Sequence, residues 1–336
     1  MKVASLFTGA GGLDKGLHDA GHSIILQVEN DPRAQQVLKT HFPGTLLVAD
    51  VCGLERLPVE TELLAAGFPC PDVSRLGLRE GMAGSSRTGL VRHVFRLLKT
   101  TKVPWVLLEN VIGLLDRVQG KPAVIESVVD ELEALGYRWA YRTINTAGFG
   151  LPQRRRRIFI LASLHGDPRD VLLPQRGCLH TACLNVYDQP CFQCYQTTQE
   201  PDGSSAFVID LQEYRKPVGS VNITPTIKCT QNLCAVLPGG SFGALEVEDA
   251  ERLQGFPPGW TAPCYPLQNP YLSAASTRKT PENVYRSNAE RDRWALIGNA
   301  VSVPVAEWIG VNLMNAYETH KYIPSKETDK KLKPSV

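Results

Sequence analysis

The sequence of 336 residues has no unbroken apolar run of the roughly 18–20 residues that a membrane-spanning helix needs. It also has no signal-peptide pattern, because Met1-Lys-Val-Ala-Ser-Leu-Phe7 already forms an expected strand. A net charge of only +2 gives no general electrostatic signal for a polyanionic partner. We therefore expect an intracellular protein with no membrane association, in the nucleus of a eukaryote or in the cytoplasm or nucleoid of a bacterium.

A disulfide framework is also absent, since the nine cysteines are odd in number and irregularly spaced. Most of these thiols are expected to pack as small hydrophobic groups in a reducing compartment. One Cys-x-x-Cys pair has the spacing of metal ligands, but no second clean pair accompanies it. We predict no metal site, and the zinc candidates that the spacing leaves open are Cys178, Cys183, Cys191 and Cys194.

Alternating strand and helix patterns fill the first 165 residues. Repeated units of this length indicate a parallel sheet that is covered by helices on both faces. The sequence therefore predicts an α/β fold with a doubly wound, mostly parallel sheet. The expected strands are 3–7, 24–28, 45–49, 63–68, 105–108, 139–144 and 158–162, and the expected helices include 32–41, 89–99, 122–135 and 247–254.

After residue 164 the alternating strand and helix patterns give way to scattered Gly, Pro, Cys and Gln with little periodicity, which predicts a second, smaller domain. Residues 1–164 together with 294–320 are expected to form the large domain, because apolar periodicity returns near residue 297. Residues 165–293 are assigned to the small domain, with a polar insertion at 261–293. Residues 321–336 are expected to be a flexible tail.

Functional groups follow five successive strands of the large domain. The first strand leads into a Gly-rich loop, and the next four are followed by Glu29, Asp50, Cys70 and Glu109. Ligands of open parallel sheets bind at the carboxyl ends of the strands. A carboxylate after the second strand can accept both ribose hydroxyls, and Asp50 can accept an adenine amino group. Because the Gly-rich loop lacks the lysine of a phosphate-binding loop, a nucleoside cofactor is favoured.

Six ordered motifs connect these residues to a known family. They are Ser5-Leu-Phe-Thr-Gly-Ala-Gly-Gly12, Gly67-Phe-Pro-Cys70, Glu109-Asn-Val111, Gly150-Leu-Pro-Gln-Arg-Arg-Arg-Arg157, Arg252-Leu-Gln-Gly-Phe-Pro257 and Gly298-Asn-Ala-Val-Ser-Val-Pro304. From residue 3 to about 315, the chain resembles the S-adenosylmethionine-dependent cytosine-C5 DNA methyltransferases. The resemblance implies a Rossmann-like methyltransferase domain for catalysis and cofactor binding, and a target-recognition role for residues 165–293.

The resemblance also implies a catalytic set. Cys70 would add to C6 of a cytosine that is flipped out of double-stranded DNA, while Glu109 holds and protonates N3. By the match to Gln-x-Arg-x-Arg, Arg155 and Arg157 would face the cytosine and the backbone near it, and alternation along a strand would place both on one face. The family usually has Gln where this chain has Pro71, which removes a backbone donor beside the nucleophile.

The cofactor that the resemblance implies is S-adenosylmethionine, with S-adenosylhomocysteine as the product. Glu29 would bind the ribose and Asp50 the adenine. The expected cofactor-binding residues are Phe7, Gly9, Gly11, Gly12, Leu13, Glu29, Asn30, Asp50, Val51, Leu90, Asn299 and Val301.

Two other functions stay open at this stage. The first is a cytosine-C5 methyltransferase that acts on tRNA, although the Cys-Phe-Thr signature of that sub-family is not visible. The second is a catalytically silent DNA-binding regulatory homologue, against which the intact Cys70 and Glu109 argue. Double-stranded DNA is the expected partner, and a monomer is the expected oligomeric state.

Overall fold

The computed structural model describes eight segments of the chain. They are residues 1–69, 90–117, 122–173, 206–210, 218–229, 233–237, 240–264 and 288–321. Cys70, Pro71 and the zinc candidates Cys178, Cys183, Cys191 and Cys194 lie outside these segments. The predicted tail is described only as far as Lys321.

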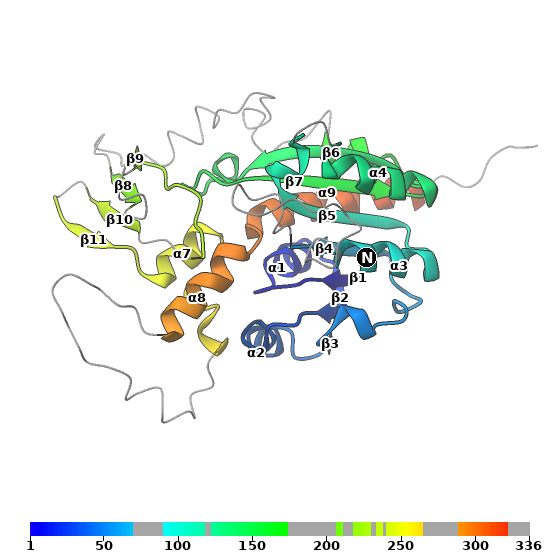
Figure 1. The fold of residues 1–336 in the computed structure, drawn as a ribbon, viewed down its shortest axis with the longest axis horizontal. Helices are drawn as coiled ribbons and strands as arrows, with labels where there is room; N and C mark the ends of the chain where they lie inside the picture. The colour runs from blue at the N-terminus through cyan, green and yellow to red at the C-terminus, as the bar shows by residue number, and fades with distance from the viewer. Residues whose placement is uncertain are drawn as a thin grey trace, which may run out of the picture.

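A seven-stranded sheet forms the centre of the larger part of the molecule (Figure 1). Its strand order is β3-β2-β1-β4-β5-β7-β6, in which β1 to β5 are mutually parallel and β7 is antiparallel to both of its neighbours. The mostly parallel sheet expected from the sequence is thereby confirmed. The strands are β1 (Lys2–Leu6), β2 (Ser23–Val28), β3 (Leu46–Val48), β4 (Leu63–Gly67), β5 (Trp105–Val111), β6 (Arg138–Asn145) and β7 (Arg156–Ser163).

Helices cover both faces of this sheet, as predicted. On β4, Leu64 and Ala66 pack into one hydrophobic cluster, whereas Leu63 and Ala65 pack into the other, because successive side chains of a strand point to opposite faces. The first cluster lies under α3 (Val91–Thr100) and α4 (Val124–Ala134), and the second under α1 (Gly12–Asp19), α5 (Pro168–Leu172) and α9 (Val303–Lys321).

The predicted start of helix α2 (Pro32–His41) is also confirmed. The Asp31 side chain accepts a hydrogen bond from the backbone N–H of Arg33, and Pro32 occupies the first turn, where its missing N–H costs nothing. This cap fixes the chain direction directly after Glu29.

A second sheet of four short antiparallel strands lies at one end of the molecule (Figure 1). Its order is β11-β10-β8-β9, with strands β8 (Phe207–Asp210), β9 (Val218–Val221), β10 (Leu233–Val236) and β11 (Phe242–Ala244). A third hydrophobic cluster joins this sheet to helices α2, α7 (Val247–Leu253) and α8 (Asn288–Asn299). The second sheet falls in the range assigned to the small domain, whose boundaries stay a prediction.

One segment, Ala289–Glu318, is apolar and long enough to cross a membrane by length and composition alone. It contains most of α8 and α9, and 67% of its most apolar window is buried inside the structure. The core helix of a globular domain passes the same test, so this is weak evidence for a membrane span.

Candidate active site

The strand order reverses between β1 and β4. From β1 the sheet continues through β2 and β3 on one side and through β4 and β5 on the other. In doubly wound sheets such a reversal opens a crevice at the carboxyl ends of the two central strands. The Gly-rich loop follows β1 here, and β4 ends at Gly67, from which Phe68-Pro69 leads directly into Cys70.

The Gly-rich loop begins with a strained residue. Phe7 has φ +57°, a left-handed conformation that non-glycine residues adopt at a cost and that clusters at functional sites. Gly9 also has φ +57°, and a Cβ added there would meet no heavy atom within 4 Å. At Gly9 the loop therefore offers half-buried backbone with open space beside it.

The Glu29 carboxylate is fixed by the same loop. Its Oε2 accepts a hydrogen bond from Gly9 N at 2.7 Å, and its Oε1 accepts one from Asp31 N at 2.8 Å. Only 8% of Glu29 is exposed, and burial raises the pKa of this carboxyl, against which the backbone hydrogen bonds act. A carboxylate oriented in this way next to open backbone fits the ribose hydroxyls of a nucleoside.

The Gly-rich loop is in direct contact with the turn between α8 and α9, which contains Asn299 and Val301. A Cβ at Gly12 would lie 2.2 Å from the Val301 carbonyl oxygen, so this close approach requires glycine. Leu13 and Val301 belong to the same buried cluster. Asn299 lies two residues before Val301, and its Oδ1 accepts a hydrogen bond from the Cys229 thiol at 3.1 Å. The structure thus brings together predicted cofactor residues from both ends of the chain.

The other predicted cofactor residues lie near the ends of β1, β2 and β3. Phe7, Val51 and Leu90 share one hydrophobic cluster. Asp50 is exposed and accepts a hydrogen bond from Cys52 N, which lowers the pKa of Asp50 and caps a short 3-10 turn. Asn30 is exposed, whereas a Cβ at Gly11 would contact Leu38 and Phe42 at 3.0 and 3.2 Å.

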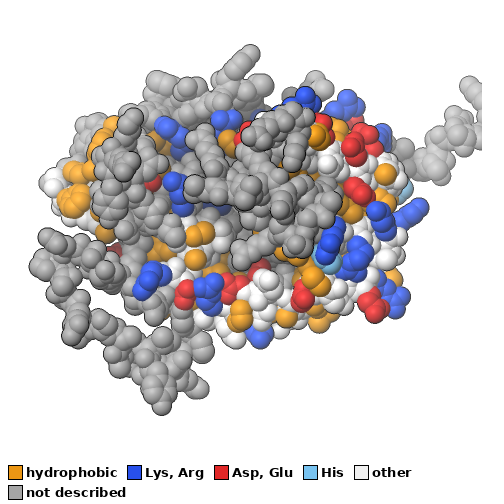
Figure 2. Space-filling model, in the orientation of Figure 1, with side chains coloured by type: hydrophobic (Ala, Val, Ile, Leu, Met, Phe, Trp, Pro, Cys, Tyr) orange, Lys and Arg blue, Asp and Glu red, His pale blue; other side chains and the backbone are white. Residues whose placement is uncertain are grey.

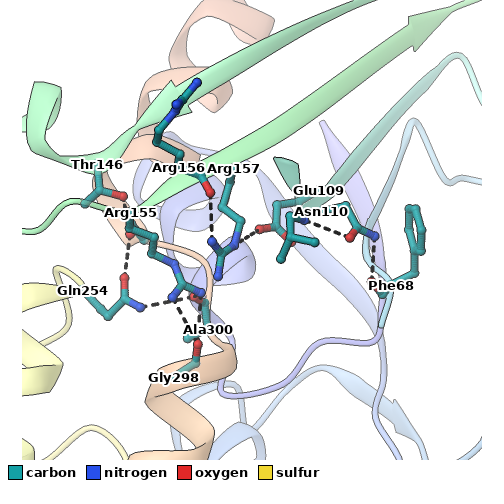
Figure 3. Close-up of polar contacts among 12 residues, drawn as sticks. Phe68, Glu109, Asn110, Thr146, Arg155, Arg156, Arg157, Gln254, Gly298 and Ala300 are labelled. Atoms are coloured by element: carbon teal, nitrogen blue, oxygen red, sulfur yellow. Dashed lines mark hydrogen bonds and ion pairs between the residues drawn. The ribbon is translucent and has the colours of Figure 1, made fainter. Parts of the chain in front are cut away.

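The Glu109 carboxyl lies beside the end of β4. Glu109 pairs with Gly67 across β4 and β5, and its Oε2 is 3.5 Å from the position of a Gly67 Cβ. Arg157 Nε forms an ion pair with Glu109 Oε1 at 3.2 Å (Figure 3). Burial raises the pKa of Glu109, while the charges of Arg157 and Arg155 oppose that rise. The acid is therefore held beside Gly67, which lies three residues before Cys70, and burial favours the protonated form of the acid.

The neighbouring Asn110 braces the end of β4. Its Nδ2 donates to the Phe68 carbonyl oxygen at 3.0 Å, and its Oδ1 accepts from Val111 N at 2.8 Å (Figure 3). Phe68 lies two residues before Cys70, so the side chain that follows the acid restrains the backbone that leads to the thiol.

Arg155 and Arg157 have different surroundings. The match to Gln-x-Arg-x-Arg led us to expect both to face the cytosine. Arg155 precedes β7, which begins at Arg156, and its side chain points to the same side as Arg157 and away from the side of Arg156 (Figure 3). Arg157 pairs with Glu109, whereas the Arg155 guanidinium donates to backbone carbonyls of Ile227, Gly298 and Ala300 (Figure 3). Contact of Arg155 with cytosine stays a prediction.

A buried polar network around these arginines was not predicted. Gln153 Nε2 donates to the Leu253 carbonyl oxygen, and Ser302 Oγ donates to Gln254 Oε1 and bonds to Thr146 Oγ1. Gln153 and Gln254 each belong to a motif quoted above, so their motif membership was the signal that could have identified them. Among the described residues, no group of three or more His, Cys, Asp or Glu could hold a metal ion.

A family model described as C-5 cytosine-specific DNA methylase matches residues 1–233 of the chain. The chain belongs to this family. It is therefore a DNA (cytosine-5-)-methyltransferase, and membership of the DNA methylase family implies a methyl donor. The resemblance drawn from the six motifs is thereby confirmed.

Curated relatives of this methyltransferase agree with the family. It is 38% identical to the type II methyltransferase M2.BsuMI of Bacillus subtilis over 326 residues, which cover 93% of this chain and 75% of that protein. It is 30% identical to the type II methyltransferase M.MspI of a Moraxella species over 166 residues, which cover 49% of this chain and 39% of that protein.

Solved structures support the fold of the methyltransferase. The Entamoeba histolytica methyltransferase EhMeth superposes with a TM-score of 0.61 at 13% identity, over 94% of this chain and 98% of that chain. The Dnmt2 methyltransferase of S. pombe superposes with a TM-score of 0.56 at 16% identity, over 94% of this chain and 99% of that chain. At these identities the likeness shows the Rossmann-like fold alone.

Proposed function

We propose that this methyltransferase transfers a methyl group from S-adenosylmethionine to C5 of a cytosine flipped out of double-stranded DNA, through a transient covalent bond between Cys70 and C6. The observation that carries the proposal is the position of Glu109. This buried acid lies beside Gly67, on the strand next to the one that leads into Cys70, and is paired with Arg157.

Cytosine C5 is a poor nucleophile, and this pair of residues would activate it. The Cys70 thiolate forms a bond to C6 while Glu109 gives its proton to N3, so the electrons of the C5–C6 double bond become available at C5. After C5 has accepted the methyl group, the C5 proton is lost to a base, the sulfur–C6 bond breaks to regenerate the thiolate, and N3 returns its proton to Glu109.

Burial prepares Glu109 for this role. Because burial raises the pKa of Glu109, a larger fraction of the carboxyl carries the proton that N3 must receive. Arg157 fixes the orientation of the carboxyl and would stabilise the carboxylate that remains after the transfer.

The residues around the Gly-rich loop fit S-adenosylmethionine. Glu29 would bind the ribose, Gly9 would allow the methionine moiety close to the backbone, and Asp50 would accept the adenine amino group. Phe7, Val51 and Leu90 would supply the apolar walls. The bound cofactor supplies an electrophilic methyl group on its sulfonium sulfur.

Base flipping follows from the location of the acid. N3 and C6 of a paired cytosine are not accessible to two side chains within a duplex, so the base must leave the helix to reach Glu109. Since Glu109 is only 8% exposed, the base would have to enter the protein to meet it.

The test is transfer of a tritiated methyl group to double-stranded DNA and to tRNA by the wild type, Cys70→Ala and a Cys234→Ala control. We expect label in DNA, its loss in Cys70→Ala and its retention in the control. DNA that contains 5-fluorocytosine should trap a denaturation-resistant complex, because fluorine cannot leave C5 as a cation. Label in tRNA only, or label that survives the Cys70 change, would contradict the proposal.

A further inference from the structure

Arg155 is a completely enclosed cation on the described part of the chain. Only 1% of it is exposed, and its guanidinium donates four hydrogen bonds, all to backbone carbonyls. Nη1 donates to Ile227 O at 3.2 Å and to Gly298 O at 3.1 Å. Nη2 donates to Gly298 O at 3.1 Å and to Ala300 O at 2.7 Å, and the contacts with Gly298 and Ala300 are drawn in Figure 3. Among the described residues, Nε has no hydrogen-bond partner.

Two of these carbonyls flank the predicted cofactor residue Asn299. They lie where α8 ends and the chain turns into α9, at a helix C-terminus whose carbonyls lack partners within the helix. A positive charge is favourable at this end of a helix because the backbone dipoles leave partial negative charge there. Arg155 therefore caps α8 and fixes the turn that carries Asn299.

The third carbonyl belongs to a segment that presses on the same turn. A Cβ at Gly298 would lie 2.6 Å from Cys229 N and 2.7 Å from the Lys228 carbonyl carbon, so the two backbones touch. The Cys229 thiol donates to Asn299 Oδ1 at 3.1 Å. The turn is thus held between Arg155 on one side and residues 227–229 on the other.

The catalytic acid is connected to the same short segment. Arg155 lies two residues before Arg157, which is the ion-pair partner of Glu109. Gln153, two residues before Arg155, donates to Leu253 O and accepts a hydrogen bond from Ile227 N through its Oε1. This segment therefore contacts the turn at residues 298–300 through Arg155 and the proposed catalytic acid Glu109 through Arg157.

We propose that Arg155 is a positioning residue that sets the Asn299 turn for S-adenosylmethionine, and that it is not a contact to the cytosine. This inference rests on the proposed function, in which Asn299 lines the cofactor site. A base contact and a turn-positioning role differ in one measurable respect. Only the positioning role makes the affinity for S-adenosylmethionine depend on Arg155 when no DNA is present.

The experiment measures the dissociation constant of tritiated S-adenosylmethionine by equilibrium dialysis without DNA, for the wild type, Arg155→Lys and Arg157→Lys. A lysine ammonium is a point charge that cannot reproduce the planar fork across three carbonyls. We expect Arg155→Lys to weaken binding at least ~10-fold, corresponding to about 1.4 kcal/mol. Arg157→Lys should keep the wild-type affinity and lose turnover, which identifies the cofactor effect as specific to Arg155.

Chemical rescue separates positioning from a general loss of fold. Arg155→Ala should bind S-adenosylmethionine weakly, and ethylguanidinium, which replaces the missing atoms, should restore the affinity. Ethylammonium should not restore it.

Circular dichroism identifies the variants that fold. If the Arg155 variants do not fold, Cys229→Ala and Cys229→Ser replace them. Cys229→Ala removes the donor to Asn299 and should weaken the binding of S-adenosylmethionine, whereas Cys229→Ser keeps a donor and should retain the affinity.

The inference is overturned if Arg155→Lys keeps its cofactor affinity while its kcat or its KM for DNA changes, since that pattern indicates a base contact. Wild-type affinity in Cys229→Ala would overturn it as well. These outcomes differ from failure of the proposed function, which would appear in the wild type as absence of cofactor binding or of DNA methylation. Asn299→Ala is the reference variant, because it shows how far the affinity for S-adenosylmethionine falls when the Asn299 side chain is removed.

Discussion

Asp14 permits a quantitative test of how the Gly-rich loop is supported. The residue is fully buried on α1 and lies two residues beyond Gly12. Its Oδ2 accepts from Ser5 Oγ at 2.8 Å, and its Oδ1 accepts from Gln27 Nε2 at 2.9 Å. Burial raises the pKa of Asp14 from 3.8 to about 6, although both hydrogen bonds act in the opposite direction. The perturbation we consider is Asp14→Asn, which has almost the same shape and no charge.

The sign of the effect follows from the two pKa values. Because the pKa is higher in the folded protein, the folded state holds the proton more tightly between pH 3.8 and about 6. The contribution of Asp14 to stability is complete below pH 3.8 and is lost as the pH rises to about 6. At about 1.36 kcal/mol per pKa unit, the loss is about 3 kcal/mol. Asn cannot ionise, and its amide can accept from Gln27 and donate to Ser5 Oγ.

We therefore expect Asp14→Asn to raise the free energy of unfolding by up to about 3 kcal/mol at pH 8 and to leave it nearly unchanged at pH 4. Urea unfolding at pH 4, 5, 6 and 8 measures the difference from the wild type. Asp130→Asn, on the exposed surface of α4, is the control, for which no such pH-dependent difference is expected. A difference between Asp14→Asn and wild type that is constant over this range, or that grows toward low pH, would refute the reasoning.

Three further outcomes are expected. Trp260→Phe removes the indole N–H that donates to Ala10 O at 2.7 Å and weakens the stack on His41. It should therefore lower the free energy of unfolding by about 1–2 kcal/mol and raise KM for S-adenosylmethionine more than it lowers kcat. Equal effects on kcat and KM at an unchanged stability would contradict this. Glu109→Gln should lower kcat by about 10²–10³-fold with unchanged cofactor affinity in dialysis, since it removes only the proton donor, and a turnover near that of the wild type would count against the acid. Metal analysis of the purified protein should find less than about half an equivalent of zinc, because one Cys-x-x-Cys pair does not complete a tetrahedral site.

Much of the large domain could be predicted because its sequence signals are local. Apolar runs such as Leu63–Gly67 are typical of strands buried on both faces, and Asp31-Pro32 is a local helix start. The carboxyl ends of parallel strands meet at one edge, so Glu29 and Glu109 could be assigned to a common site before their contacts were known.

The remaining features depend on contacts between distant parts of the chain. The second sheet has strands of only three or four residues, such as Leu233–Val236, which are too short for a period to be recognised. The surroundings of Arg155 come from residues 72 to 145 positions away, and no local pattern contains them. The expectation for Arg155 and Arg157 came from a motif match, which carries no information on the distant backbone carbonyls that enclose Arg155.

The reversed direction of β7 is what brings Arg157 to Glu109, the proposed catalytic acid. In a parallel sheet the beginning of a strand lies at the edge opposite to the ligand site. Because β7 is antiparallel to β5, its first residues lie at the same edge as the carboxyl end of β5, and Arg157 is the register partner of Val111, two residues after Glu109. A parallel strand at this position would have carried Arg157 to the far edge and left Glu109 buried without a cation. The insertion of β7 between β5 and β6 therefore places a basic run at the start of a strand within the proposed active site.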